Sequence, residues 1–285
     1  MKYLITGAGG QLGKEWVEKL AQIGEAFTSY TSKHLDITNI DLLRKVLSDD
    51  KPDILINCAA YTAVDLAEDE PEKADLINNT SLIALSALCN EFEIKLIHYS
   101  TDYVFSGEGK NQKNYPNGYP ENALKKPINS YGNSKAGGEE QIINSGCDFL
   151  IIRVAWLCGR HGNNFVKTML RLSESKSDIN IVNDQFGVPT YCFDVVEHTM
   201  QLINKNLSGI YHLGSKGCIS WFDFAKKLFS LSSKKIQVNP ISSDQFKSKA
   251  KRPTYSKLDT SKFENNTGVK MQSWETGLVK LLSQL

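Results

Sequence analysis

The amino-acid sequence predicts an α/β protein, a Rossmann-type doubly wound parallel sheet with a smaller C-terminal lobe. Two observations favour this fold class. A short apolar strand opens the chain and ends in a glycine-rich turn at residues 7–13. Apolar runs of strand length then alternate with helical patterns as far as residue 154. Such alternation is typical of a parallel sheet covered by helices on both faces, with right-handed crossovers between the strands.

Each element has its own justification. Residues 2–6 form an apolar run, and Leu12, Trp16 and Leu20 recur after it at helical spacing. Asn39 is a typical N-cap for the helix that carries Leu43 and Leu47. The other expected strands are 26–31, 53–58, 95–99 and 149–154, and the other expected helices are 11–23, 74–92, 131–144, 221–231 and 274–282.

The alternation loosens beyond residue 157, where Pro189, Pro240 and Pro253 mark loops. We therefore expect residues 1–156 to form an NAD(P)-binding Rossmann domain. Residues 157–285 are expected to form mainly a substrate-binding lobe, interleaved with the end of the sheet. A length of 285 residues suits one large domain with a smaller lobe.

Composition excludes several classes of function. With 33 basic and 32 acidic residues the net charge is +1, so no global field attracts nucleic acid. No run approaches the roughly 20 apolar residues that span a bilayer, and the N-terminal apolar run is too short for a signal peptide. We expect a cytoplasmic protein with no membrane partner. The six cysteines lack Cys-x-x-Cys spacing and are expected to be buried thiols.

The turn after the first strand predicts a dinucleotide site. Gly7, Gly10 and Gly13 follow the pattern Gly-x-x-Gly-x-x-Gly, and Gln11 and Leu12 begin the helix. Glycines allow a tight turn and a close approach of phosphate to the N-terminus of the helix.

The segment after the second strand favours NADPH and leaves NADH open. Residues 27–33 (FTSYTSK) contain no carboxylate that would repel a 2′-phosphate, and they offer hydroxyls and Lys33. Asp36 and Ile37 follow this strand on the crevice side, where Asp36 could bond adenine or simply start the next helix.

Tyr131 and Lys135 form the most informative pair in the chain. Residues four apart share one helical face, so we expect an ammonium close enough to the phenol to lower its pKa. Such a tyrosine exchanges a proton with a substrate oxygen near neutral pH. Together with the glycine turn, the pair indicates a carbonyl reductase or an alcohol dehydrogenase.

With the glycine turn, Thr101 and this pair in order, the chain resembles the extended short-chain dehydrogenase/reductases. Within them it is similar to the reductases of dTDP-linked 4-keto-6-deoxy sugars. The segments that carry the resemblance are 57–68 (NCAAYTAVDLAE), 98–107 (HYSTDYVFSG), 131–139 (YGNSKAGGE), 153–156 (RVAW), 162–172 (GNNFVKTMLRL), 184–190 (DQFGVPT) and 252–263 (RPTYSKLDTSKF).

The resemblance implies hydride transfer from NADPH to the C4 ketone of a dTDP-4-keto-6-deoxy-L-hexose, to give dTDP-L-rhamnose. Tyr131 would donate the proton, Lys135 would hold the nicotinamide ribose, and Thr101 would hydrogen-bond the ketone oxygen. The other implied contacts are Asp102 and Trp156 to the sugar, and Ala60, Tyr61 and Thr62 to the dinucleotide. The planar guanidinium of Arg252 suits a phosphate, so this residue either meets the diphosphate or is a surface charge in a lysine-rich segment.

Some members of the family hold magnesium between two subunits with carboxylates. Glu15 matches one ligand, but Tyr191, Cys192 and Phe193 stand where those members place a glutamate, and Asp194 is shifted by one position. The sequence therefore argues against a metal. A homodimer stays possible, but the sequence argues against one that is linked through magnesium.

Other functions stay open. A dehydratase would need an acidic residue where Tyr103 follows Asp102, so it is disfavoured, and an epimerase is equally disfavoured. A reductase of another nucleotide-linked 4-keto-6-deoxy sugar is the nearest alternative. A non-catalytic regulatory subunit of the same fold would not need Tyr131 or Lys135, and both are present.

Overall fold

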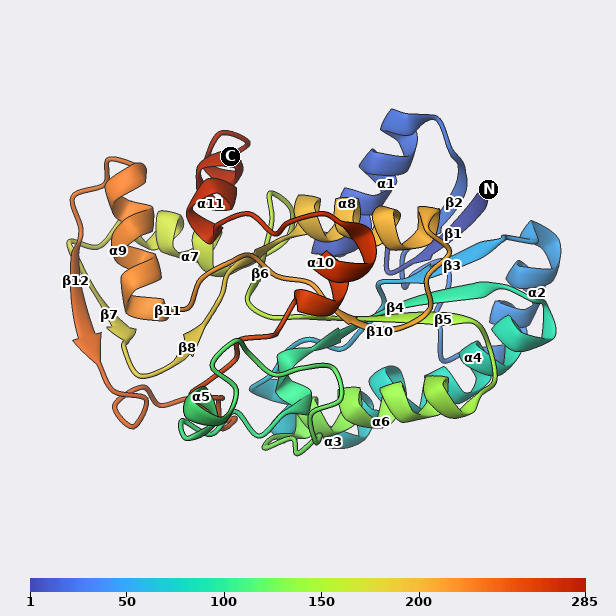
Figure 1. Ribbon diagram of the computed structural model, residues 1–285, viewed down its shortest axis with the longest axis horizontal. Coiled ribbons are helices and arrows are strands. Elements are labelled where there is room, and N and C mark those ends of the chain that lie inside the picture. Colours follow the sequence, from blue (N-terminus) through green and yellow to red (C-terminus); the bar gives the residue numbers. More distant parts are fainter.

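The structure, a computed structural model, describes residues 1–285 and has a six-stranded parallel sheet at its centre. The strand order is β10-β5-β4-β3-β1-β2. In Figure 1, α1 and α8 cover one face of this sheet, and α2, α4 and α6 cover the other. The elements of the sheet layers are β1 (Lys2–Thr6), α1 (Gln11–Ile23), β2 (Ala26–Tyr30), α2 (Ile40–Asp50), β3 (Ile54–Asn57), α4 (Ser81–Glu91), β4 (Lys95–Thr101), α6 (Ser130–Asn144), β5 (Phe149–Val154), α8 (Cys192–Asn204) and β10 (Gly209–His212).

Two apolar cores lie on the two faces of the sheet. Trp16 of α1 and Val195 of α8 belong to the first core, and Leu43 of α2 and Leu85 of α4 belong to the second. Both faces of β3 and β4 are buried, which explains their continuous apolar runs. The α/β Rossmann-type fold predicted from the sequence is confirmed.

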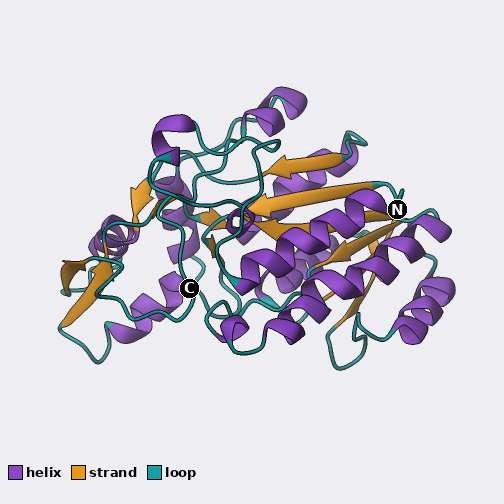
Figure 2. Cartoon of the chain, turned by 90° about the horizontal axis from the view of Figure 1, so that it is seen from below, coloured by secondary structure: helices purple, strands orange, loops and turns teal.

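The lobe lies beside the sheet, at the left of Figure 1, and Figure 2 shows the same separation from below. Its core is formed by Val166, Tyr191, Phe224 and Trp274 with ten other side chains. The lobe is built from β6 (Leu157–Cys158), α7 (Phe165–Leu172), β7 (Asp178–Val182), β8 (Phe186–Gly187), β9 (Thr190–Tyr191), β11 (Ile219–Ser220), α9 (Trp221–Leu231), β12 (Gln237–Ile241) and α11 (Trp274–Leu282).

The predicted helices 11–23, 221–231 and 274–282 and the strand 149–154 have the predicted bounds. The helix expected over 74–92 is instead a run of three parts, α3 (Pro71–Asp75), the π-helical turn η2 (Leu76–Thr80) and α4. The sequence did not predict α7, α8, β10, α5 (Asn111–Asn114), α10 (Ser261–Thr267) or the short turns η1 (Leu66–Glu68) and η3 (Asp102–Val104). The division at residue 156 stays a prediction, and α8 and β10 return to the main sheet.

Candidate active site

The glycine turn brings the backbone of β1, β3 and α1 into close contact. Gly7 has φ +64°, and a Cβ there would lie 2.5 Å from the Ala59 nitrogen. A Cβ at Gly13 would lie 2.3 Å from the Gly7 carbonyl oxygen. Gly10 is the N-cap of α1, and no side chain caps this end of the helix. The first amides of α1 are therefore available to an anion, as a pyrophosphate site requires.

The side chains that follow the turn face other parts of the protein. Gln11 donates to the Leu157 carbonyl at 3.2 Å and accepts from Asn164 at 2.7 Å, so its amide joins α1 to the lobe. Leu12 is buried in the core between α1 and the sheet. Their side chains are therefore engaged elsewhere, and these two residues can offer a ligand at the turn only their backbone amides.

The loop after β3 is held by an asparagine that the sequence analysis missed. Asn78 accepts from the Tyr61 N–H and donates to the Tyr61 carbonyl, both at 2.9 Å. It lies in η2, and such π-helical turns redirect side chains at functional sites. Ala60, Tyr61 and Thr62 are thus fixed beside the crevice end of the sheet. The sequence marks this role of Asn78 only by placing a polar asparagine inside a helical pattern.

Asp36 and Ile37 have partners within the protein, and their contact with adenine stays a prediction. The Asp36 carboxylate accepts from the backbone N–H and the hydroxyl of Thr38, at 2.9 and 2.8 Å. Ile37 is buried in the core beside α2. The aspartate therefore organises the turn that precedes α2, which is the alternative that the sequence left open.

Thr101 and Asp102 end β4 at the crevice. The Thr101 hydroxyl donates to Asp102 Oδ1 at 3.1 Å and accepts from the Tyr103 N–H at 3.2 Å. Asp102 is 4% exposed, and its Oδ2 has no hydrogen-bond partner. Burial raises the pKa of Asp102 to about 6, although hydrogen bonds from Ser256 and Thr101 oppose the rise. An unpaired carboxylate oxygen is costly in a buried site unless a ligand meets it.

Tyr131 lies in the first turn of α6, which Asn129 caps by accepting from the Gly132 N–H at 2.7 Å. The expected low pKa of this phenol is wrong. Burial raises its pKa well above 10, the charge of Asp102 adds to the rise, and a hydrogen bond from Thr101 opposes it. The ring packs edge-on against Tyr103, with centroids 5.5 Å apart. The phenol is therefore protonated at neutral pH.

Lys135 explains why the prediction failed. Its Nζ donates to the Tyr99 carbonyl at 2.6 Å and contacts His98 Nε2 at 3.0 Å, so it points into the sheet. The side chain is 2% exposed, and burial lowers the pKa of Lys135 to about 8, while Glu139 and Cys58 oppose the fall. Helical spacing predicted the shared face, but burial determines both titrations.

A groove of about 1040 Å³ lies between the end of β4 and the lobe. Tyr103, Trp156, Arg252 and Ser256 line it from the sheet side, and Phe165, Met169, Ile179, Ile181, Gln185 and Trp221 are among those that line it from the lobe. Its size and mixed lining suit a nucleotide-sized ligand. Tyr103, which lines the groove, packs edge-on against Tyr131, so the groove runs from the neighbourhood of Tyr131 to the lobe.

Trp156 has an unusual backbone, with φ +49°, directly after β5. Its indole stacks on Trp221 with a centroid distance of 3.5 Å and an interplanar angle of 12°. A Cβ at Gly187 would lie 2.6 Å from Cε2 of the same ring. The indole is thus held between α9 and β8, in a conformation that a β-carbon-bearing residue adopts only when its surroundings fix it.

Arg252 lines the groove and is already paired. Its Nη2 lies 2.6 Å from Asp65 Oδ2, and its Nη1 lies 3.4 Å from the Tyr103 hydroxyl. The side chain is 24% exposed, so part of the guanidinium faces the solvent.

A second crevice holds the residues that bear on a metal. Glu15, Glu18, Arg160, Asp194 and Lys280 line it, and His161 offers a ligand atom within 4.8 Å of Glu15 and Glu18. The Arg160 guanidinium pairs with both Glu15 and Glu18. Because a guanidinium already compensates these carboxylates, the donor set does not fit a divalent cation, and no step below uses one.

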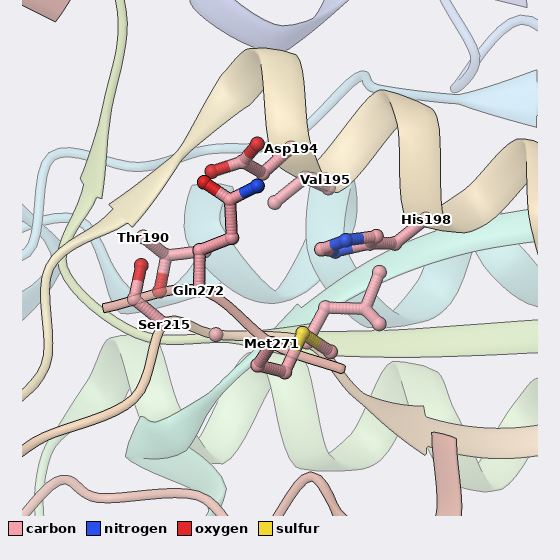
Figure 3. Close-up of a pocket in the computed structure, with 9 residues that line it drawn as sticks. Thr190, Asp194, Val195, His198, Ser215, Met271 and Gln272 are labelled. Carbon is pink, nitrogen blue, oxygen red and sulfur yellow. The ribbon is translucent and has the colours of Figure 1, made fainter. Parts of the chain in front are cut away.

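Figure 3 shows a third, small crevice on the α8 side of the sheet. Asp194 and His198 of α8 face Gln272 and Met271 across it. Burial lowers the pKa of His198 to about 4 and raises the pKa of Asp194 to about 6. Tyr131 and Lys135 belong to α6 on the opposite face, so this crevice is separate from the candidate site.

Comparison with known proteins places these features in a family. The family model described as RmlD substrate binding domain matches residues 1–285. The chain belongs to this family. Among its relatives, the dTDP-4-dehydrorhamnose reductase of Escherichia coli strain K12 is 36% identical, over 100% of this chain and 98% of the relative. The dTDP-4-keto-6-deoxy-D-glucose reductase of Streptomyces niveus is 34% identical, over 98% and 96% of the two chains.

Solved structures agree with this membership of the RmlD family. The crystal structure of dTDP-4-dehydrorhamnose reductase from Bacillus anthracis strain Ames, in complex with NADP, has a TM-score of 0.95 and 40% identity. The comparison covers 100% of this chain and 99% of that one. None of the helices in this chain has the length and apolar character that crossing a bilayer requires.

Proposed function

We propose that this chain is an NADPH-dependent dTDP-4-dehydrorhamnose reductase. It reduces the C4 ketone of dTDP-4-dehydro-6-deoxy-L-mannose to dTDP-L-rhamnose. Full-length similarity to reductases of that name supports this function. The observation that carries it is the protonated phenol of Tyr131, whose ring packs against Tyr103 in the wall of a groove of nucleotide size. A reductase must deliver a proton, and a phenol with a raised pKa holds one.

The residues of the glycine turn fit a dinucleotide. Added β-carbons at Gly7 and Gly13 would strike the backbone of Ala59 and of Gly7, so only glycines permit the tight turn that would bring a pyrophosphate to the α1 N-terminus. Gly10, Gln11 and Leu12 would contribute their backbone amides. Thr31, Ser32 and Lys33 after β2 offer hydroxyls and a cation to a 2′-phosphate, which favours NADPH over NADH. When bound, the cofactor supplies the hydride.

The chain's own residues supply the proton and the positioning. Tyr131 donates its phenolic proton to the C4 oxygen as that oxygen gains charge. The Thr101 hydroxyl donates to the same oxygen after turning from Asp102 Oδ1. Lys135 lies one turn along α6 from Tyr131 and holds the nicotinamide ribose.

Three further residues bind the substrate. The unpaired Oδ2 of Asp102 accepts a sugar hydroxyl, and the indole of Trp156 forms an apolar wall for the hexose. Arg252 lies along the groove and meets the diphosphate with the part of its guanidinium that Asp65 leaves free. Ala60, Tyr61 and Thr62 line the dinucleotide at the crevice, in the loop that Asn78 fixes.

The decisive experiment follows the loss of reduced-nicotinamide absorbance with the dTDP-4-keto-L-sugar, in parallel with NADPH and NADH. Tyr131→Phe should lower kcat by about 10²–10⁴-fold, because the phenol acts in proton transfer. NADPH affinity should be retained. Tyr211→Phe is the matched control, since Tyr211 lies on β10 and its hydroxyl bonds only Asn266 of α10. Full turnover by Tyr131→Phe would refute the role of the phenol.

A second candidate is reduction of another dTDP-linked 4-keto-6-deoxy sugar. The Streptomyces niveus relative, a dTDP-4-keto-6-deoxy-D-glucose reductase, is nearly as similar as the rhamnose enzymes. Comparing kcat/KM for the L-hexose and the D-hexose substrates decides between the two. The homodimer and the cytoplasmic location suggested by the sequence stay predictions.

A further inference from the structure

The segment 242–252, called the strap below, connects the lobe to the loop after β3 and passes along the substrate groove. It leaves the lobe at the end of β12, where Figure 1 shows it in orange. Gln245, Phe246, Lys247 and Arg252 of the strap line the groove. The strap contains no helix and no strand, so its position depends on the contacts at its two ends.

The first anchor of the strap is Asp184, in the lobe between β7 and β8. Its carboxylate accepts from the Ser243 backbone N–H at 2.8 Å and from the Ser243 hydroxyl at 2.6 Å. The Gln185 amide nitrogen donates to the same hydroxyl at 2.9 Å. Because a charged acceptor strengthens such hydrogen bonds, this end of the strap stays with the lobe.

The second anchor of the strap lies at the start of α6. Asp65 accepts from the Ala250 N–H at 3.1 Å and from Arg252 Nη2 at 2.6 Å. Asn129, the N-cap of α6, donates to the Lys251 carbonyl at 2.8 Å. Ala250 is 1% exposed, so this end of the strap is packed as well as hydrogen-bonded. The strap is therefore fixed at both ends.

The middle of the strap is free between these anchors. Residues 244–248 make hydrogen bonds only to other residues of the strap. Phe246 is 47% exposed, and it lines the same groove as Ile179 and Ile181 of β7. An apolar ring stabilises a protein by leaving water, so a ring that stays this exposed contributes little to the free protein. A ligand in the groove would bury it.

The charge and length of the strap suit a nucleoside diphosphate. Lys249 pairs with Asp69, whereas Lys247 lines the groove without an acidic partner. Arg252 follows Phe246 by six positions in the chain. An extended chain of that length spans at most about 20 Å, which is enough to pass from a diphosphate to the base of the same nucleotide.

We propose that residues 244–249 close over the nucleoside end of the substrate, so that the Phe246 ring covers the base on the side opposite Ile179 and Ile181. Lys247 then faces the phosphates. Both anchors keep their hydrogen bonds, and only the free middle of the strap moves. The identity of the base as thymine rests on the function proposed above. The strap holds a part of the substrate that does not react, so it acts on binding and not on proton transfer.

Calorimetric titration of the full-length protein with dTDP tests the contact between Phe246 and the base. Phe246→Ala should weaken dTDP binding about 10-fold, and Phe246→Tyr, which keeps an aromatic ring, should retain it. Binding of inorganic pyrophosphate, which has no base, should not change in either variant. Leu231→Ala is the matched control, because this side chain is 37% exposed at the end of α9 and lies outside the groove. An unchanged dTDP affinity in Phe246→Ala, or an equal loss for dTDP and pyrophosphate, would overturn the proposal.

Limited proteolysis tests the closure itself, because Lys247, Lys249 and Lys251 are exposed sites for trypsin. With dTDP at about 100 times its Kd, cleavage at Lys247 should slow at least about 10-fold. Cleavage after Lys234 and Lys235, which are exposed in the loop between α9 and β12 and lie outside the groove, should not change. Equal cleavage at Lys247 with and without dTDP would also overturn the proposal.

Reductase turnover measured on the same samples tests only the proposed function. A protein that fails to reduce the dTDP-4-keto-L-sugar, but whose strap dTDP protects, would refute the reductase and support the strap. An active reductase whose strap dTDP leaves open to trypsin would refute the strap alone.

Discussion

Gly187→Ala should damage substrate binding through the Trp156 indole. The new Cβ would lie 2.6 Å from Cε2 and 2.8 Å from Cζ2 of that ring, whereas ordinary contact begins near 3.4 Å. The indole must therefore retreat by about 0.8 Å. Trp221 is stacked on the same indole with a centroid distance of 3.5 Å, so a shift of the ring disturbs the stack.

A displacement of nearly 1 Å in a wall of the sugar site can cost about 100-fold in catalysis. We expect KM for the dTDP-sugar to rise about 10- to 100-fold while the Kd for NADPH stays unchanged, because Gly187 is remote from the glycine turn. Steady-state kinetics measures the first and fluorescence titration the second. Stacked indoles also couple in circular dichroism, and the Trp156–Trp221 signal should be lost.

Gly214→Ala is the matched control, since a Cβ there meets nothing nearer than Thr190 Oγ1 at 3.5 Å. Trp156→Phe in the Gly187→Ala background should recover part of the lost affinity, because the smaller ring leaves room for the methyl group. If Gly187→Ala keeps the wild-type KM and the wild-type dichroism, the indole is not held as described and its role as a sugar wall fails.

Three other perturbations follow from buried contacts. Glu139→Gln leaves Arg153 without its counter-charge, where both side chains are at most 2% exposed. We expect the free energy of unfolding to fall by about 3–5 kcal/mol and Tm to fall by about 5–8 °C in calorimetry. The control Glu140→Gln changes a side chain that is 62% exposed and should cost less than about 1 kcal/mol. Gly13→Ala places a Cβ 2.3 Å from the Gly7 oxygen, and titration should show NADPH binding weakened at least about 10-fold with dTDP binding intact. Folding raises the pKa of Asp102 from 3.8 to about 6. The folded protein is therefore most stable below about pH 4, where this carboxyl is protonated in both states, and it loses stability as the pH rises to 6. Asp102→Asn should therefore be more stable than wild type by up to roughly 3 kcal/mol at pH 7–8, less as pH falls to 4, and less active; a constant difference in urea unfolding across that range would contradict this.

The sequence predicted the sheet elements well because each has a local cause. Amphipathic spacing placed α1 and α9, and a side-chain cap placed α2 after Asn39. The missed elements have mostly non-local causes. Strand β10 is only four residues long and is stabilised by pairing with β5, about 60 residues earlier in the chain. Helix α8 directly follows the two-residue strand β9, so no loop residues in the sequence mark where the helix begins.

The candidate site was predicted in its residues but less well in its interactions. Thr101, Asp102 and Tyr131 meet at the end of β4, as strand ends and helix spacing indicated. For Asp36 the sequence left adenine binding and the start of the next helix open, and the hydroxyl and amide of Thr38, two residues away, bind one oxygen of its carboxylate. A local hydrogen bond of that kind competes with any ligand and is hard to distinguish from a binding residue by type alone.

The charge of Lys135 shows where a spacing rule ends. Four residues along a helix place a lysine and a tyrosine on one face, whatever lies beneath that face. Beneath α6 lies a sheet whose register brings Asn57 and His98 to the lysine, and register is a property of β1, β3 and β4 together. The same Tyr-x-x-x-Lys spacing above an apolar row would leave Lys135 without its contact to His98, and the pKa of the lysine would be different. The strands under the helix therefore determine the pKa values of the tyrosine and the lysine. A sequence motif can predict these pKa values only together with the strand positions that face the helix.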